Sequence, residues 1–140
     1  MELKILQNLN EDIIAIRTEA FVAQRNVPKE IELDGRDSEL LHFCLYEGDT
    51  LLSYLRAEGI DDVIHVGRVT TATLERGKGY GRQLMEALCE YAKTQGFRFV
   101  ELNAVDTAVG FYEKLGFIPE GDYFLETGVP HIYMKKELSV

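Results

Sequence analysis

The chain has 140 residues, of which 46% are hydrophobic and 28% are charged, and its net charge is -9 at pH 7. This length and composition are typical of one globular domain, so we expect a single domain over residues 1–140. The acidic balance argues against nucleic acid as a partner, because a negative field repels a polyanion. Two cysteines are too few for a disulfide framework or a zinc cluster, and we expect no metal.

The first residues, MELKILQNLNEDII, have no basic segment that leads into an apolar one. No apolar run in the chain approaches the roughly 20 residues that a membrane span requires. We therefore expect a cytoplasmic protein without a membrane partner.

The N-terminal residues predict a strand followed by a helix. Residues 2–7 alternate as a short strand does, and residues 10–27 have the period of an amphipathic helix with Asn10 as its N-cap. The apolar stripe of this helix comprises Ile13, Ile14, Ile16, Ala20 and Phe21. Residues 29–39 are polar, contain a glycine and show no period, so we expect a loop there.

Three runs with strand character follow. Residues 40–47 and 51–58 flank the turn EGDT and predict a β-hairpin. Residues 62–73 are rich in β-branched side chains and predict a third strand, antiparallel to its neighbour.

The C-terminal half alternates helices and strands. A period of 3.6 residues begins at Tyr80 and predicts a helix that ends at Gly96, with Leu84, Ala87, Leu88 and Tyr91 on its apolar face. Residues 97–104 predict a strand, and residues 106–117 predict a helix that ends at Gly116. The remaining residues predict two short strands joined by a loop.

The turn RGKGYGR, residues 76–82, places three glycines and three cations between a strand and a helix. The start of a helix presents backbone N–H groups without an intrahelical acceptor at the positive end of the helix dipole. Glycines let this backbone approach an anion closely, and Arg76, Lys78 and Arg82 add positive charge. Salt screens the distant carboxylates, so a small phosphate-bearing ligand can bind despite the net charge.

Other interpretations of this turn are weaker or remain open. A Walker turn requires Gly-Lys followed by Ser or Thr after its spacer, and the dinucleotide fingerprint requires glycine where Arg82 stands. A tight turn whose glycines serve geometry alone is an alternative, and so is another nucleotide-phosphate site.

Two motifs resemble those of the GNAT superfamily of acyl-CoA-dependent N-acetyltransferases. RGKGYGRQLM resembles its acyl-CoA-binding motif through Arg76, Gly79 and Gly81, and AVGFYEKLGF, residues 108–117, resembles its second motif. The segments GRVTTATLERGKGYGRQLM, FYEKLGF and ETGVPHIYMKK resemble the ElaA-like branch of this superfamily.

The resemblance implies a fold and an activity. The fold is of the α/β (α+β) class, with a mixed central sheet of about six to seven strands that splays between strands 4 and 5, and with about four helices. The implied activity is transfer of an acetyl group from acetyl-CoA to the primary amine of a small molecule or peptide, by direct attack in a ternary complex. A non-catalytic acyl-CoA-binding or sensory module is the alternative.

The resemblance also assigns cofactor contacts and a proton donor. The implied acetyl-CoA contacts are the backbone of Val69 and Thr71 for pantetheine and, for the pyrophosphate, Arg76, Gly77, Lys78, Gly79, Tyr80, Gly81 and Arg82. Tyr112 matches the tyrosine that protonates the departing thiolate. A packed aromatic residue is the alternative for Tyr112, although Phe111 could supply that packing.

The general base and the acceptor site are less defined. Glu58 and His65 lie on central strands and could act as the base, as could His42, His131 or water. For the acceptor amine we expect an acidic loop and a second cluster near the C-terminus, namely Glu32, Asp34, Asp37, His42, Glu126 and His131. A solvated charge run explains the acidic loop equally well. Exposed strands near the C-terminus could pair two copies, which leaves a homodimer open.

Overall fold

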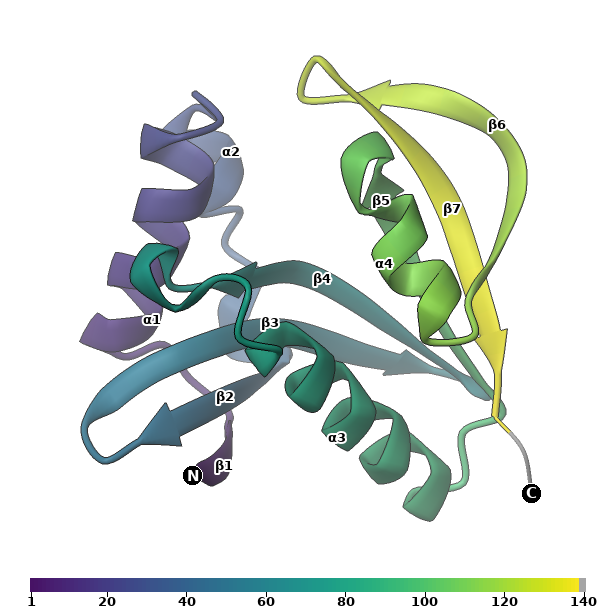
Figure 1. Ribbon diagram of the computed structural model, residues 1–140, viewed down its shortest axis with the longest axis horizontal. Coiled ribbons are helices and arrows are strands. Elements are labelled where there is room, and N and C mark those ends of the chain that lie inside the picture. The colour runs from purple at the N-terminus through teal and green to yellow at the C-terminus, as the bar shows by residue number, and fades with distance from the viewer. Residues whose placement is uncertain (139–140) are drawn as a thin grey trace. The chain divides into compact units, whose positions relative to one another are not determined.

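The computed structural model describes residues 1–138, and within them all side chains except those of Glu30, Ile31 and Thr73. Figure 1 shows its helices and strands. In chain order they are β1 (Glu2–Leu6), α1 (Glu11–Arg17), α2 (Lys29–Glu32), β2 (Leu41–Glu47), β3 (Thr50–Ile60), β4 (Val63–Thr71), α3 (Tyr80–Thr94), β5 (Phe99–Val105), α4 (Val109–Lys114), β6 (Ile118–Glu126) and β7 (Val129–Glu137). Short 3-10 segments precede β2, α3 and α4, and a π-helical turn, Thr18–Ala23, follows α1.

The strands form one mixed sheet of seven in the order β1-β2-β3-β4-β5-β7-β6. The β4 and β5 strands are parallel, because α3 connects them by a crossover, whereas β5 pairs antiparallel with β7. The parallel ladder joins Val63–Val66 to Phe99–Leu102, while the two strands continue to Thr71 and Val105. The mixed sheet and the early end of the β4–β5 ladder confirm the predicted fold class.

The chain folds into two compact units. The first unit comprises Met1–Glu58 and Arg68–Met85, and the second comprises Gly59–Gly67 and the chain from Glu86 onward. Both β4 and α3 contribute residues to each unit. We describe the two units separately.

The first unit packs α1 on the hairpin of β2 and β3. Its core contains Ile13, Ile16, Cys44, Tyr46, Leu51 and Tyr54, all buried. Asn10 caps α1 as predicted, because its Oδ1 accepts a hydrogen bond of 2.8 Å from the Ile13 N–H. Ile14, expected in the apolar stripe, is 41% exposed, since the stripe faces the sheet through Ile13 and Ile16.

Two local expectations for this unit are wrong. The predicted helix over residues 10–27 changes after Arg17 into the π-helical turn, which ends at Ala23. The predicted loop over residues 29–39 contains α2 and a 3-10 turn, Asp37–Glu39. The apolar period does run on through Ala20 and Phe21, which are buried, but it does not distinguish an α-helix from a π-helical turn. Residues 29–39 show no period that would have indicated α2.

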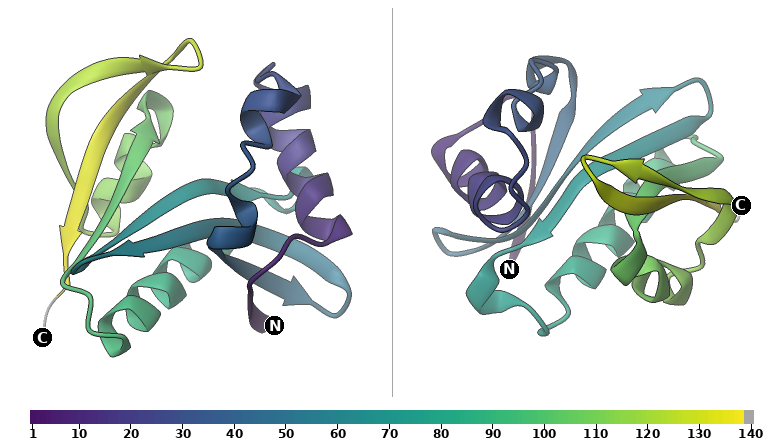
Figure 2. Two further views of the ribbon diagram at one scale, coloured as in Figure 1. Left: turned by 180° about the vertical axis from the view of Figure 1, so that it is seen from behind. Right: turned by 90° about the horizontal axis from the view of Figure 1, so that it is seen from above.

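The second unit places α4 beside β5 and the hairpin of β6 and β7, as both views in Figure 2 show. The β5 strand alternates half-buried and buried residues, with Val100, Leu102 and Ala104 buried. Gly96 follows α3 with φ +87°, and Gly116 follows α4 with φ +94°, which confirms both as the predicted helix ends.

The β6 strand lies at one edge of the sheet. Most of its residues are exposed, including Ile118, Tyr123 and Leu125. Its register with β7 shifts between Glu120 and Phe124, where Gly121 has φ +83°. Such irregularities blunt an exposed edge. A homodimer through these strands, which the sequence leaves open, stays a prediction.

Two further observations concern whole classes of site. No helix within residues 1–138 is both long and apolar enough to cross a membrane. Among the side chains that the structure describes, no group of three or more His, Cys, Asp or Glu residues is arranged to hold a metal ion.

Candidate active site

The glycine turn enters α3 through two left-handed residues. Gly77 has φ +82° and Gly79 has φ +84°, a backbone region that other residues adopt at a cost. A Cβ added at either position would meet no atom within 4 Å, so steric crowding does not explain these glycines. Their backbone conformation does, and the space above them remains open to a ligand.

The first turn of α3 offers backbone donors. The first hydrogen bond at the start of α3 runs from the Gln83 N–H to the Gly79 carbonyl, at 3.0 Å. At the start of a helix the first N–H groups, here those of Tyr80 and Gly81, precede the first intrahelical bond and point toward the helix N-terminus. With the helix dipole they form a setting suited to a phosphate group.

The cations of the turn are exposed and have neighbours of their own. Lys78 Nζ lies 2.9 Å from Glu75 Oε2. Arg76 donates from Nη2 to Gln24 Oε1 at 2.9 Å and from Nε to the Thr71 carbonyl at 3.3 Å. These contacts hold the Arg76 guanidinium at the end of β4, beside the turn.

The β4 strand changes direction at Arg68, which has φ +55° within a strand. A left-handed residue in a strand marks a bulge and interrupts the ladder, which agrees with the end of the parallel pairing at Val66. The Ala72 N–H donates to the Leu52 carbonyl of β3 at 2.9 Å, and Ser53 Oγ donates to the Thr70 carbonyl at 3.0 Å. Because backbone groups alternate between the two edges of a strand, those of Val69 and Thr71 point away from β3.

Tyr112 lies on α4 in the second unit and is 7% exposed, whereas Phe111 is 38% exposed. The Tyr112 ring meets Phe111 and Phe117 edge to face, with centroid distances of 5.1 and 5.8 Å. Tyr112 is therefore the more buried of the two rings, and the packing that Phe111 could have supplied comes largely from Tyr112. The role of its hydroxyl stays a prediction.

The acidic loop forms a cluster of ion pairs with two arginines. Arg17 on α1 binds Glu32 Oε1 at 2.6 Å and Asp37 Oδ1 at 2.7 Å. Arg56 on β3 binds both oxygens of Asp34, at 3.0 and 2.6 Å, and Asp37 at 3.1 Å. The loop is thus neither a solvated charge run nor a set of unpaired carboxylates.

The pKa shifts in this cluster follow from the pairing. Hydrogen bonds from Arg56 hold the pKa of Asp34 well below its usual range. Burial alone would raise the pKa of Asp37, but hydrogen bonds from Arg17 and Arg56 leave it lowered. Burial likewise opposes ionisation of Arg17, yet its bonds to Asp37 and Glu32 raise its pKa.

His42 is fully buried beside this cluster. One ring nitrogen, Nε2, lies 2.8 Å from the Asp37 carbonyl, which can only accept, so Nε2 is the donor. Tyr54 then donates its hydroxyl to Nδ1 across 2.5 Å, and burial raises the pKa of that phenol. Both nitrogens of His42 are therefore occupied within the protein.

Glu58 lies near the end of β3, where its carboxylate pairs with the Arg36 guanidinium. Its side chain is 30% exposed. The pair holds the carboxylate at the surface of the first unit, and the role of Glu58 as a base stays a prediction.

Glu126 and His131 lie on the hairpin of β6 and β7. His131 Nδ1 donates to the Val129 carbonyl at 2.8 Å, and His131 Nε2 lies 3.4 Å from Glu126 Oε2. The Phe124 ring stacks on the His131 ring, with centroids 6.2 Å apart. The structure thus brings Glu126 and His131 together, as the sequence suggested.

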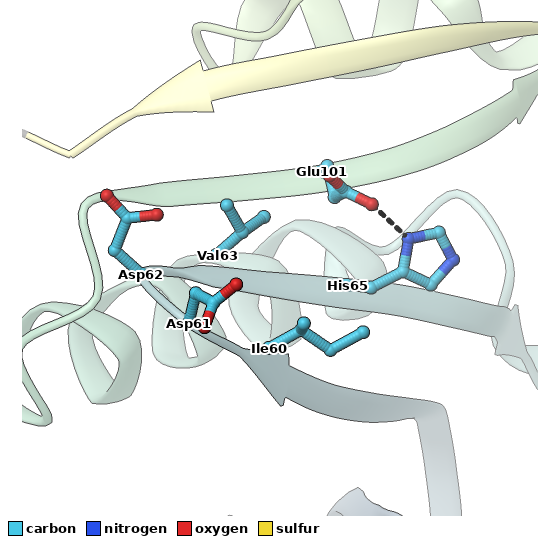
Figure 3. A pocket seen from close by; sticks show the side chains of 6 residues that line it. All are labelled: Ile60, Asp61, Asp62, Val63, His65 and Glu101. Atoms are coloured by element: carbon cyan, nitrogen blue, oxygen red, sulfur yellow. Dashed lines mark hydrogen bonds and ion pairs between the residues drawn. The ribbon is translucent and has the colours of Figure 1, made fainter.

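A pocket of about 290 Å³ lies in the second unit around the turn between β3 and β4. It is lined by Ile60, Asp61, Asp62, Val63, His65 and Glu101 (Figure 3). His65 points toward Glu101, and its Nδ1 lies 2.8 Å from Glu101 Oε2. None of the residues that we assign to acetyl-CoA lines this pocket.

The residues of the turn fit the diphosphate of acetyl-CoA. The fit rests on the open space above Gly77 and Gly79, the backbone donors of the first turn of α3 and the neighbouring cations. A bulged strand whose outer backbone groups precede such a turn suits an extended pantetheine arm.

The sheet order, the β4–β5 pair and the turn into α3 define an acyltransferase of the GNAT fold. The chain belongs to the acetyltransferase (GNAT) domain family, whose model matches residues 6–138. Within this family it falls in the ElaA-like branch. The resemblance inferred from the sequence is thereby confirmed.

Three similar proteins illustrate this placement. The chain is 33% identical over 128 residues to the uncharacterised N-acetyltransferase YjcF of Bacillus subtilis, and the match covers 91% of each chain. It is 31% identical over 132 residues to the protein ElaA of Escherichia coli, and this match covers 90% of this chain and 86% of ElaA. The crystal structure of a putative N-acetyltransferase from Lactobacillus plantarum superposes with a TM-score of 0.91 at 31% identity, over 99% and 98% of the two chains.

Sequence reasoning missed the arginines that partner the acidic loop. Arg17 and Arg56 lie within a helix and a strand, where single cations are common on solvent faces. The only signal was their placement at positions where the local period calls for buried residues. Arg68 in the bulge of β4 carried no such signal.

Proposed function

We propose that the chain is an acetyl-CoA-dependent N-acetyltransferase that acts on a primary amine of a small molecule or peptide. One observation carries the proposal: two left-handed glycines, open to a ligand, lead directly into the first turn of α3. Membership of the GNAT acetyltransferase family supports the same conclusion.

In this proposal the backbone N–H groups of residues 77–82 bind the diphosphate, and Arg76, Lys78 and Arg82 balance its charge. The backbone of Val69 and Thr71 pairs with the pantetheine arm as an added strand would. Acetyl-CoA, when bound, supplies an activated acetyl thioester. Fixing it on the protein lowers the entropic cost of reaction with the amine.

Two side chains would move protons. Tyr112 donates its phenolic proton to the departing sulfur. Glu58, or a water molecule, accepts a proton from the amine, because only the neutral amine attacks. The amine nitrogen forms the new C–N bond, the C–S bond breaks, and the nitrogen then loses its second proton, which restores the Tyr112 phenol. The products are the amide and the thiol.

Glu126 and His131 are the acidic and imidazole groups that we propose for the acceptor site. They are already paired on one hairpin, and the Glu126 side chain is 48% exposed. Internal partners already occupy polar atoms of Glu32, Asp34 and His42, so the part that we propose for them in acceptor binding is indirect: they fix the acidic loop of the first unit.

Acetyl transfer is tested by a turnover screen that measures released thiol with polyamines, aminoglycosides, amino acids and peptide N-termini. Tyr112→Phe should lower kcat by about 10²-fold or more if the hydroxyl is the proton donor, while the affinity for acetyl-CoA stays nearly unchanged. Tyr123→Phe on β6, where the tyrosine is 55% exposed, is the matched control.

The binding-module alternative predicts a different result. It requires acetyl-CoA binding without turnover on any amine, and it predicts no effect of Tyr112→Phe. Competition by ATP in a thermal-shift assay would instead indicate a general nucleotide-phosphate site, since a specific ligand raises the Tm with occupancy.

A further inference from the structure

A basic surface lies at the end of the π-helical turn in the first unit. Phe21 is buried, and the Arg25 and Arg68 guanidinium carbons lie 5.1 and 6.0 Å from its ring centroid. Arg76 reaches the same segment, because its Nη2 donates to Gln24 Oε1 at 2.9 Å. We call Phe21, Arg25, Arg68 and Arg76 the arginine face. In a chain with a net charge of -9, this grouping of cations is unexpected.

The backbone around the arginine face is irregular at three places. Residues Thr18–Ala23 form a π-helical turn, Asn26 has φ 56°, and Arg68 has φ 55°. π-helical turns and left-handed residues other than glycine cost free energy and occur frequently at functional sites. All three irregularities lie at or next to residues of the arginine face, which makes this surface a candidate for a ligand site.

The charge balance nearby indicates the sign of the ligand. Glu32 and Asp34 make their short ion pairs, each of 2.6 Å, with Arg17 and Arg56. Arg68 Nη2 donates to the Glu32 carbonyl at 3.1 Å, and its guanidinium lies farther from the same carboxylates, at 3.4 Å from Glu32 and 3.7 Å from Asp34. Burial lowers the pKa of Arg68, and repulsion from Arg56 lowers it further. An added anion would offset both effects.

We propose that the arginine face binds an anionic oxygen group of the acceptor, so that the preferred acceptors are amines that also carry a carboxylate. This inference rests on the proposed acetyl transfer. Guanidinium groups bind carboxylates with paired hydrogen bonds. The Phe21 ring holds two guanidinium groups, those of Arg25 and Arg68, by cation–π contact. The acidic loop, in contrast, has its carboxylates in ion pairs and is a poor site for a polycation.

The phosphates of acetyl-CoA are a second source of the same chemistry, and a titration separates the two. Acetate and succinate are added at constant ionic strength to protein saturated with CoA, and the arginine Nε–Hε signals are followed by NMR. We expect saturable shifts at Arg25 and Arg68. Shifts that occur only without CoA would assign the arginine face to the cofactor and overturn the proposal, and so would an absence of saturable shifts.

Two variants and a matched control test the residues. Arg25→Gln and Arg68→Gln should each weaken succinate binding about tenfold, the usual effect of losing one charge-assisted hydrogen bond. Arg98→Gln is the control, because the Arg98 guanidinium carbon also lies 5.1 Å from an aromatic centroid, that of Phe99 in the second unit. Thermal unfolding checks that Arg68→Gln folds, and the exposed Arg25 gives an independent result if it does not.

Acceptor preference is measured with amino acids and their carboxamides in the thiol-release assay. The proposal predicts a higher kcat/KM for the carboxylates and loss of that preference in Arg25→Gln. A preference for the carboxamides or for polyamines would overturn it. Calorimetry with acetyl-CoA tests the cofactor binding of the proposed function separately. The succinate titration tests the anion site, whether or not the protein binds acetyl-CoA.

Discussion

Arg17 Nε lies 2.6 Å from Glu32 Oε1, and the two residues are 0% and 1% exposed. The pair joins α1 to α2 across a segment that has no regular α-helical structure. Arg17 also donates to the Glu32 carbonyl at 2.9 Å and to Asp37 at 2.7 Å. Hydrogen bonds at every side of the guanidinium offset much of the cost of burying it.

Removal of one member of this pair should strongly destabilise the protein. Glu32→Gln leaves a buried guanidinium without its closest carboxylate, and the free energy of unfolding should fall by about 3 kcal/mol or more. Urea unfolding followed by circular dichroism measures the change. Asp62→Asn is the control, because its pair with Arg98 spans 4.0 Å between exposed side chains and should contribute little. Equal stability of the two variants would contradict this account.

The same cluster predicts acid sensitivity. The pKa values of Asp34 and Asp37 are lower in the folded chain than in the unfolded chain, so the unfolded chain takes up protons first as the pH falls. Their stabilisation is complete above the ordinary aspartate pKa of about 3.9 and decreases below it. The stability gap between the wild type and Asp34→Asn should therefore narrow below about pH 4. A gap that is constant with pH, measured by urea unfolding, would argue against the pairing.

The N-cap of α1 should contribute a small, separable stabilisation. Asn10→Ala removes the acceptor for the Ile13 N–H and the 3.2 Å bond from Asn10 Nδ2 to Tyr46, and we expect a loss of about 1 kcal/mol. Asn10→Ser keeps a capping oxygen and should recover most of this loss. Thermal unfolding compares the three proteins. No difference between Ala and Ser would show that the cap is unimportant.

The two thiols should react slowly in the folded protein. Burial raises the pKa of Cys44 to about 12, and it also raises the pKa of Cys89. Because the thiolate is the reactive form, neither should react with a disulfide reagent at pH 8 at the rate of an exposed thiol, and Cys89 should react before the fully buried Cys44. A fast reaction at Cys44 would contradict its burial. Slow reaction also leaves little background in the thiol-release assay.

Much of the fold follows from local pattern. The alternation in residues 40–47 and 51–58, the 3.6-residue period after Tyr80 and the glycines at 96 and 116 each specify an element within a few residues. The glycine turn is also visible from sequence, because left-handed positions before a helix favour glycine.

The parts that sequence reasoning did not predict depend on distant partners. Residues 29–39 show no hydrophobic period from which a structure could be predicted. Ion pairs with Arg17 and Arg56, which are remote in sequence, order this segment. The burial of Tyr112 instead of Phe111 depends on Phe117 beyond the end of α4. The bulge at Arg68 places a non-glycine residue in a left-handed conformation, which no local pattern indicates.

Our central claim is that the glycine turn binds the diphosphate of acetyl-CoA. Its most direct test is calorimetry of acetyl-CoA binding to wild type, Gly79→Ala and Gly121→Ala. Gly79 and Gly121 have φ +84° and +83°, and an added Cβ meets nothing within 4 Å at either, so the two substitutions impose similar backbone strain. We predict that wild type and Gly121→Ala bind acetyl-CoA and that Gly79→Ala binds it at least about tenfold more weakly, because of the two glycines only Gly79 lies in the glycine turn. No heat with wild type, or equal affinity in all three proteins, would contradict the claim.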